Sequence, residues 1–353
     1  MKSSYKFILG LALGLTVVLG IMMTAFSLPA VKSGINNVPI GLVAPNEATY
    51  DKLAKPLSDK GFKVKHYDST ADVKDAVNHR KIYGAFEMSA TGDLSLYQAT
   101  AASAAVAQGL NQIGQGVVTQ QKAAAKAQLA PMMAQTTDLN TLKALNAKSA
   151  AVDTKTLKVV ELKSFPKADP KGTGLAAGAL PIALGGWIGA VAIANMIKGK
   201  KQKFYAALAF AFIGGLGLVG VIQFGVGTFD GNYFLTSLGA MVGIAATAFF
   251  VLGLLEVMGN GGLGIAAVML ILLGNPLSGL SSAPEMLPKF WGALGQLLPP
   301  GATGTLLRDI AFFNGNGIAK SLTVLLTYVV VGWILFTIGK KSVIDASTSE
   351  TNA

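Results

Sequence analysis

"GGWIGAVAIANMIKGKKQKFYAALAFAFIGG", residues 185–215, joins the end of one apolar run to the start of another. The complete runs cover 175–197 and 204–226, and a helix needs about 20 apolar residues to cross a bilayer core of roughly 30 Å. Four lysines lie in the turn "KGKKQK" between the two runs. Because lysines in short loops stay on the cytoplasmic side, this stretch predicts two antiparallel membrane helices joined in the cytoplasm.

Four further apolar runs extend this pattern over the rest of the chain, at 7–28, 234–257, 263–280 and 318–339. Of the 353 residues, 52% are hydrophobic and 13% are charged, whereas soluble domains are about 25% charged. The mean hydropathy is +0.51. We therefore predict a polytopic α-helical membrane protein with six transmembrane helices.

The lysines near the ends of the runs also predict the orientation of the chain. Lys2 and Lys6 precede the first run, and Lys340 and Lys341 follow the last. Together with "KGKKQK" they place both termini in the cytoplasm and residues 30–172 outside a cell membrane. The first run exceeds the ~7–15 residues of a signal-peptide core, and "SLPAVKS" after it is a poor cleavage site, so we expect an uncleaved signal-anchor.

The segment 30–172 alternates between strand-like and helix-like patterns. Strand patterns occur at 38–44, 62–68, 82–88, 93–99 and 156–166. One helix is expected to end at Gly61, a second to begin at Asp68, Ser69 or Thr70, and a third, rich in alanine and glutamine, to cover 100–128. We predict an extracytoplasmic α/β domain whose helical arm serves as a stalk or a dimer contact.

An interrupted apolar stretch, residues 281–315, separates the last two runs. Ser282 and Glu285 have the spacing of a capping box and predict the start of a short helix. "PPG" at 299–301 is expected to end that helix, and a second helix is expected from Thr303 to Phe313. We interpret the stretch as an outer re-entrant hairpin before the sixth helix, with a loop lying flat on the bilayer as the alternative.

Several classes of chemistry lack their usual residues. The chain contains no cysteine and no phosphate-binding loop, and His66 and His79 have no metal-ligand spacing. We expect no enzyme activity, no cofactor and no metal, and no nucleic-acid partner despite the net charge of +11, because the lysines form no stripe with arginine or aromatic residues. Glu256, at the cytoplasmic end of the fourth span, is the one candidate for an intramembrane charge, and a place at the interface near the turn "MGNGG" is the favoured alternative. We therefore expect the energy for transport to come from a partner.

Three segments resemble a known family. They are "VPIGLVAPNEATYDKLAKPL", "KDAVNHRKIYGAFEMSATGDLSLY" and "LPKFWGALGQLLPPGATGTLLRDIAFFNG". Their order is similar to that in the membrane subunits of ABC-2 type transporters, in particular the bacterial branch related to phage infection protein. The resemblance implies a homodimeric exporter subunit in the lipid bilayer, powered by a separate cytoplasmic ATPase.

The resulting organisation is a signal-anchor helix at 1–29, the outer domain at 30–172, a five-helix domain at 173–341 and a cytoplasmic tail at 342–353. We expect the cargo to be an amphipathic or lipid-like substrate, drug or peptide. The alternative is an envelope scaffold, secretion-system component or phage-receptor-like protein that transports nothing. Candidate residues of the outer gate or path are Trp291, Pro299, Pro300, Arg308 and Asp309. Candidates for cytoplasmic coupling are Lys198, Lys200, Lys201, Lys203 and Glu256.

Overall fold

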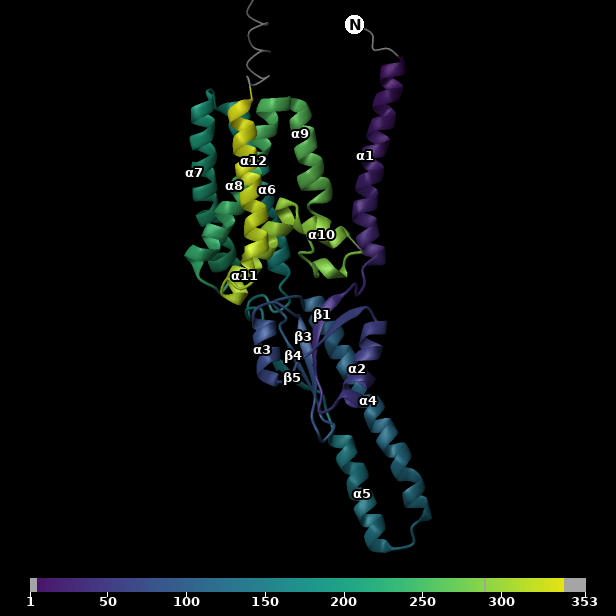
Figure 1. The fold of residues 1–353 in the computed structure, drawn as a ribbon. Coiled ribbons are helices and arrows are strands. Elements are labelled where there is room, and N and C mark those ends of the chain that lie inside the picture. The colour runs from purple at the N-terminus through teal and green to yellow at the C-terminus, as the bar shows by residue number, and fades with distance from the viewer. Residues whose placement is uncertain (1–4, 289, 340–353) are drawn as a thin grey trace, which may run out of the picture. The chain divides into compact units, whose positions relative to one another are not determined.

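The computed structural model describes residues 5–288 and 290–339 and divides into two compact units (Figure 1). One unit comprises Met1–Asn36 and Phe165–Ala353, and the other is Asn37–Ser164. The second unit is shorter at both ends than the outer domain expected from the sequence. Lys2, Lys340, Lys341 and the expected tail at 342–353 lie outside the described residues.

The unit Asn37–Ser164 is built on a five-stranded mixed sheet of order β2-β1-β3-β4-β5. Its strands are β1 (Val38–Val43), β2 (Phe62–His66), β3 (Gly84–Met88), β4 (Leu94–Gln98) and β5 (Lys158–Glu161). β1 pairs in parallel with β2 and β3, β3 pairs antiparallel with β4, and β4 pairs in parallel with β5. All five strands fall within the strand patterns of the sequence.

Local caps define the first two helices of this unit. Asn46 caps α2 (Glu47–Asp59) by accepting the amide of Thr49, and Ser69 caps α3 (Thr70–Asn78) by accepting the amide of Asp72. Two longer helices, α4 (Ala104–Gln135) and α5 (Leu139–Thr154), pack side by side as an arm that leaves the sheet (Figure 1). The expected third helix is therefore present, and it extends beyond the predicted end at 128.

The strand alternation separates the two faces of the sheet. Ile40, Leu42 and Phe86 face α2 and α4, and all three are buried. Glu87, one residue on from Phe86, accepts a 2.7 Å hydrogen bond from the Thr70 hydroxyl of α3, so α3 covers the opposite face. This period of two is what a sheet covered by helices on both faces requires.

The other unit contains the apolar helices. They are α1 (Tyr5–Lys32), α6 (Thr173–Met196), α7 (Lys200–Gly220) with η1 (Val221–Val226), α8 (Tyr233–Met258), α9 (Asn260–Ala267) with η2 (Val268–Leu273), and α12 (Ile318–Ile338). In the described part of the chain, four segments have the length and hydropathy of a membrane crossing: α6, α7 with η1, α8 and α12. Two shorter apolar stretches lie at Ala12–Thr24 and Asn260–Leu273. The count of six spans stays a prediction.

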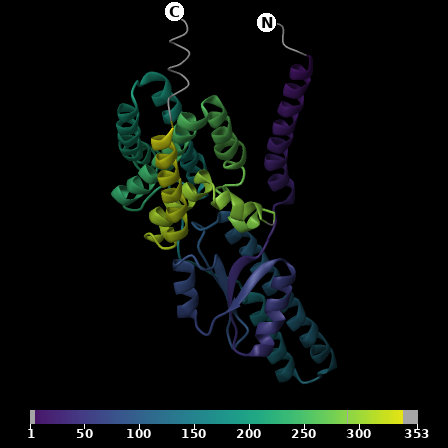
Figure 2. The ribbon, with the colours of Figure 1, turned by 45° about the horizontal axis from the view of Figure 1, so that its top comes forward.

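α8 is the centre of the helical bundle, and α6, α7, α11 (Pro299–Phe313) and α12 pack around it (Figures 1 and 2). In its candidate spanning window 78% of residues are buried, against 22% for α12. A Cβ atom at Gly332 of α12 would collide with the α8 backbone at Phe249 and Phe250. Small residues thus allow close helix crossings, as in other membrane bundles.

The fifth apolar run does not form one helix over 263–280. η2 ends at Leu273, and the residues up to Leu280 form turns. Leu277 is fully buried and Leu280 is 6% exposed. Their apolarity reflects burial inside the protein, where turn backbone is tolerated at membrane depth.

Candidate functional site

The candidate site is the interrupted segment between η2 and α12, which we call the hairpin (residues 274–317). Its longest element, α11, begins at Pro299 and Pro300. The prediction that "PPG" ends a helix is therefore wrong. Proline lacks an amide hydrogen and has a fixed φ, so it suits the first helical position as well as the position after a helix, and here burial of both prolines decides between the two.

The first half of the hairpin also differs from expectation. Pro284–Met286 form a 3₁₀ turn, and α10 covers only Trp291–Gln296. The Ser282 hydroxyl contacts the Ala283 carbonyl and caps no helix. The capping-box prediction is wrong because two prolines, Pro284 and Pro288, restrict the backbone there to short turns.

α11 is enclosed by protein along its length. Thirteen of its fifteen residues are buried, and it packs against α6, α8 and α12. On α8, a Cβ atom at Gly239 would meet Ile310, and one at Gly243 would meet Thr303. A helix lying flat on a bilayer has one solvated face, and α11 has none.

Polar side chains connect α11 to the preceding turn. Arg308, 3% exposed, donates from Nη2 to the Leu280 carbonyl at 2.9 Å. Gln296 donates to the Ser278 carbonyl at 2.8 Å and accepts from the Thr305 hydroxyl at 2.6 Å. These bonds join the turn, α10 and α11 into one network in an apolar setting, where each polar group needs a partner.

Asp309 lies at the end of α11 that leads into α12. Its side chain is buried, and its carbonyl accepts the amides of Asn314 and Gly315. Asn314 adopts the left-handed conformation at φ 55° and ends the helix. Arg308 and Asp309 are thus both enclosed by protein.

Exposed apolar side chains of the hairpin flank α10 on both sides. Phe290 is 63% exposed and stacks on Trp291 with ring centroids 5.1 Å apart. Leu297, after α10, is 52% exposed. Exposed aromatic rings are typical of segments that lie at a membrane–water interface.

A second contact ties the hairpin to the chain that follows α1. Gly34 donates its amide to the Met286 carbonyl at 3.0 Å, and Asn36 donates its amide to the Glu285 carbonyl at 3.1 Å. The Asn36 side chain also donates to the Leu287 carbonyl at 3.2 Å. We call this contact between residues 34–36 and 285–287 the clasp.

The opposite end of the bundle holds the coupling candidates. Lys203 and Glu256 form an ion pair with Nζ and Oε1 3.3 Å apart, and their side chains are 6% and 7% exposed. Lys200 donates to the carbonyls of Thr337 and Gly339 at the end of α12. Lys198 and Lys201, the remaining two, are exposed.

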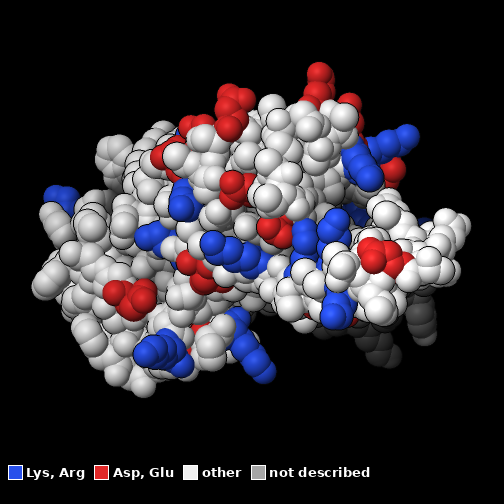
Figure 3. Space-filling view, turned by 90° about the horizontal axis from the view of Figure 1, so that it is seen from below, with Lys and Arg blue, Asp and Glu red and all other residues white. Residues whose placement is uncertain are grey.

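The unit Asn37–Ser164, all of which the structure describes, shows no metal site. Across residues 5–288 and 290–339, no group of three histidine, aspartate or glutamate side chains could hold a metal ion. His79 pairs with Asp75 on the surface. On the face drawn in Figure 3, basic and acidic side chains are interspersed.

The comparison with known proteins agrees with this architecture. A family model described as "ABC-2 family transporter protein" matches residues 6–338. The chain belongs to the ABC-2 transporter family. It is a membrane subunit, or permease, of the kind that works with a separate ATPase subunit. No curated protein matches the chain.

The family match confirms the resemblance to ABC-2 permeases, and the branch related to phage infection protein stays a prediction. Sequence analysis of this permease missed Asn36, Gln296 and the pairing of Lys203 with Glu256. A polar residue within an apolar helix was a signal for Gln296. The other two depend on contacts between distant segments, so no local pattern reveals them.

Proposed function

We propose that this ABC-2 permease exports an amphipathic or lipid-like substrate, drug or peptide, and that the hairpin is its outer gate. The observation that carries the proposal is the enclosure of α11, a short proline-initiated helix with buried Arg308 and Asp309, between α6, α8 and α12. Interrupted helices at membrane depth are typical of transport paths, because their turns and helix ends present polar groups.

The proposed topology places both termini in the cytoplasm of a cell, and Asn37–Ser164 outside it. It is testable because the chain contains no cysteine, so each introduced cysteine is unique. A membrane-impermeant maleimide added to intact cells should label Leu297→Cys and should not label Lys201→Cys until the cells are opened. Labelling of Leu297→Cys from the cytoplasmic side alone would contradict an outer gate.

The proposed energy source is an ATPase that docks on the lysine-bearing end of a homodimer. Exposed Lys198 and Lys201 are the side chains available to it there. We expect an ATPase to co-purify with the solubilised permease and the double variant Lys198→Ala, Lys201→Ala to lose it. Lys320→Ala, an exposed lysine in the first turn of α12, is the matched control. Equal recovery of ATPase with both variants would exclude this docking site.

The family match covers the membrane helices as well as the outer unit, so the alternative of a scaffold that transports nothing is not favoured. Export would be measured in vesicles as ATP-dependent movement of an amphiphilic dye. Vesicles with the permease and its ATPase that move none of a panel of amphiphiles would argue against the proposed cargo class.

A further inference from the structure

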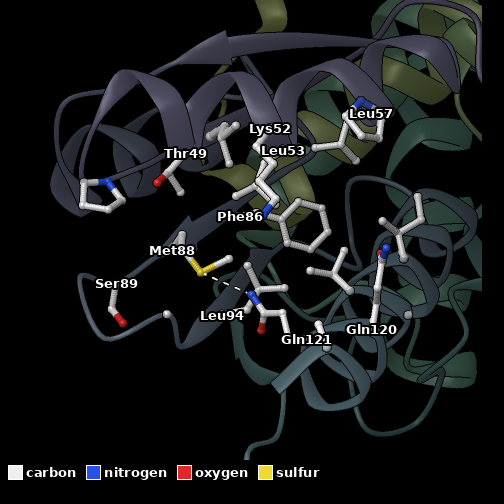
Figure 4. Close-up of a pocket in the computed structure, with 18 of the residues that line it drawn as sticks. Thr49, Lys52, Leu53, Leu57, Phe86, Met88, Ser89, Leu94, Gln120 and Gln121 are labelled. Atoms are coloured by element: carbon white, nitrogen blue, oxygen red, sulfur yellow. Dashed lines mark hydrogen bonds between the residues drawn. The ribbon is translucent and has the colours of Figure 1, made fainter. Parts of the chain in front are cut away.

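A groove of about 1150 Å³ lies within the unit Asn37–Ser164, between α2 and α4 (Figure 4). α2 packs on β1 and β2, α4 packs on β3 and β4, and the sheet forms the floor between them. Ligand pockets usually measure about 300–1,000 Å³, so the groove holds a small molecule comfortably.

The floor and inner walls of the groove are apolar. Phe86 and Met88 come from β3, and Leu53 and Leu57 line the α2 side (Figure 4). On α4, Ile113 and Val117, one turn apart, line the groove. Phe86, Met88 and Leu57 are buried, whereas Leu53, Ile113 and Val117 are half-buried, so these three present the apolar surface on which an alkyl chain gains burial.

The wall of the groove opposite α2 is formed by α4, where small and uncharged polar residues recur every four positions. Gln112, Gly116, Gln120 and Ala124 form this stripe along α4. A Cβ atom at Gly116 would meet no atom within 4 Å, so the side of the groove at this position is open space.

The charged residues that line the groove are all basic. Lys52 and Lys60 line the groove from α2, and none of its lining residues is an aspartate or glutamate. Thr49 lies one turn before Lys52 on the same side of α2 and also lines the groove (Figure 4), whereas the Ser89 hydroxyl is already bonded to Thr91 and to the Asp93 amide. A cation with a hydroxyl group nearby complements an anionic oxygen group.

We propose that this groove binds a long-chain carboxylate, with its alkyl chain along Leu53, Ile113 and Val117 and its carboxylate at Lys52. The assignment of this ligand as cargo rests on the proposed function, whereas its binding does not. The ligand is thus an amphiphile with a carboxylate headgroup, and its binding site lies in the unit Asn37–Ser164 and not among the membrane helices.

The probe is a photoactivatable hexadecanoic acid with a diazirine in its chain, added to the full-length protein in phosphatidylcholine nanodiscs. We expect mass spectrometry to find crosslinks on peptides of α2, β3 and α4. The methyl ester of the probe is the uncharged control and should crosslink there less. Crosslinks confined to the membrane helices, or equal labelling by acid and ester, would overturn the proposal.

Two variants with matched controls test the groove itself. Gly116→Trp should fill it and reduce crosslinking by about tenfold, while Gly109→Trp, also in open space on α4 but outside the lining, should leave crosslinking unchanged. Lys52→Gln should reduce labelling by the acid about two- to fivefold, as expected for an exposed ion pair, and Lys55→Gln should not. Equal labelling within either pair of variants would overturn the proposed site.

These measurements need no ATP and no ATPase. Loss of export with crosslinking intact would contradict the proposed function alone. Absence of groove crosslinking with export intact would contradict the groove alone.

Discussion

The buried ion pair between Lys203 and Glu256 should contribute strongly to the stability of the permease. Lys203 lies in the first turn of α7 and Glu256 in the last turn of α8. A helix has partial positive charge at its N-terminus and partial negative charge at its C-terminus, so each side chain sits at the unfavourable end of its own helix. Each charge is therefore stabilised mainly by the other.

Removing one partner leaves the other charge buried and unpaired. We expect Lys203→Met or Glu256→Gln to destabilise the bundle by about 3–5 kcal/mol. At about 2–4 °C per kcal/mol for a unit of this size, the unfolding midpoint should fall by about 6–20 °C. The double variant Lys203→Met, Glu256→Leu should recover most of this loss, because apolar pairs replace buried ion pairs at little cost.

The reversed pair, Lys203→Glu with Glu256→Lys, tests the helix-dipole argument separately. It puts the carboxylate at the start of α7 and the ammonium at the end of α8, where each is favoured by about 0.3–1 kcal/mol. We expect it to be at least as stable as the double apolar variant.

The assay is thermal unfolding in detergent, followed by the fluorescence of selectively excited tryptophan. The three tryptophans are Trp187, Trp291 and Trp333, so the signal reports the membrane unit alone. Lys201→Met, in the same turn of α7 and exposed, is the control and should change stability by less than about 0.5 kcal/mol. If Lys203→Met lowers the midpoint no further than Lys201→Met does, the pair does not stabilise the bundle and the argument fails.

Three further predictions concern single residues. Asn36→Ala should speed hydrogen exchange in the clasp about fivefold, since one lost bond is worth about 1 kcal/mol, and unchanged exchange would contradict its role. The Asp169 carboxylate accepts hydrogen bonds from the first two amides of α6 and from the Thr228 hydroxyl. Asp169→Ala should therefore lower the free energy of unfolding by about 1–3 kcal/mol in the tryptophan assay, and Asp169→Asn should lower it less. Equal losses of stability in the two variants would refute the capping role. Burial and then the Glu87 carboxylate raise the pKa of Tyr97 from 10.0 to about 12. The resulting stability is present below pH 10 and is lost as pH rises towards 12, so circular dichroism melting should show a steeper alkaline loss for the native chain than for Tyr97→Phe.

The unit Asn37–Ser164 could be predicted in detail because its signals are local. Strand-like patterns predict all five strands, with period-two alternation at 62–68, and Ser69 is among the expected caps of α3. These signals depend on residues within one turn or one strand, so they remain valid in any tertiary context. The order of the strands in the sheet could not be predicted in this way. It depends on which strands pair with one another, and no local sequence pattern encodes that pairing.

The hairpin was predicted less well because its local signals fit two structures equally. Pro299 and Pro300 can end one helix or begin the next, and the contacts of α11 with α8 decide the outcome. The apolar residues up to Leu280 fit a membrane span as well as a buried turn. Apolarity reports removal from water, and it does not distinguish lipid from protein as the surroundings.

The clasp and the groove are joined by a single short piece of chain. Asn36 belongs to the clasp, and Leu42 at the end of β1 lines the groove. β1 is held on both sides by β2 and β3, so it cannot lengthen or slip without breaking its ladder. If ligand in the groove changes the strength of the clasp, linkage requires that the clasp change ligand affinity by the same factor. Crosslinking of the acid probe in Asn36→Ala therefore measures the coupling between the groove and the clasp without any measurement of export.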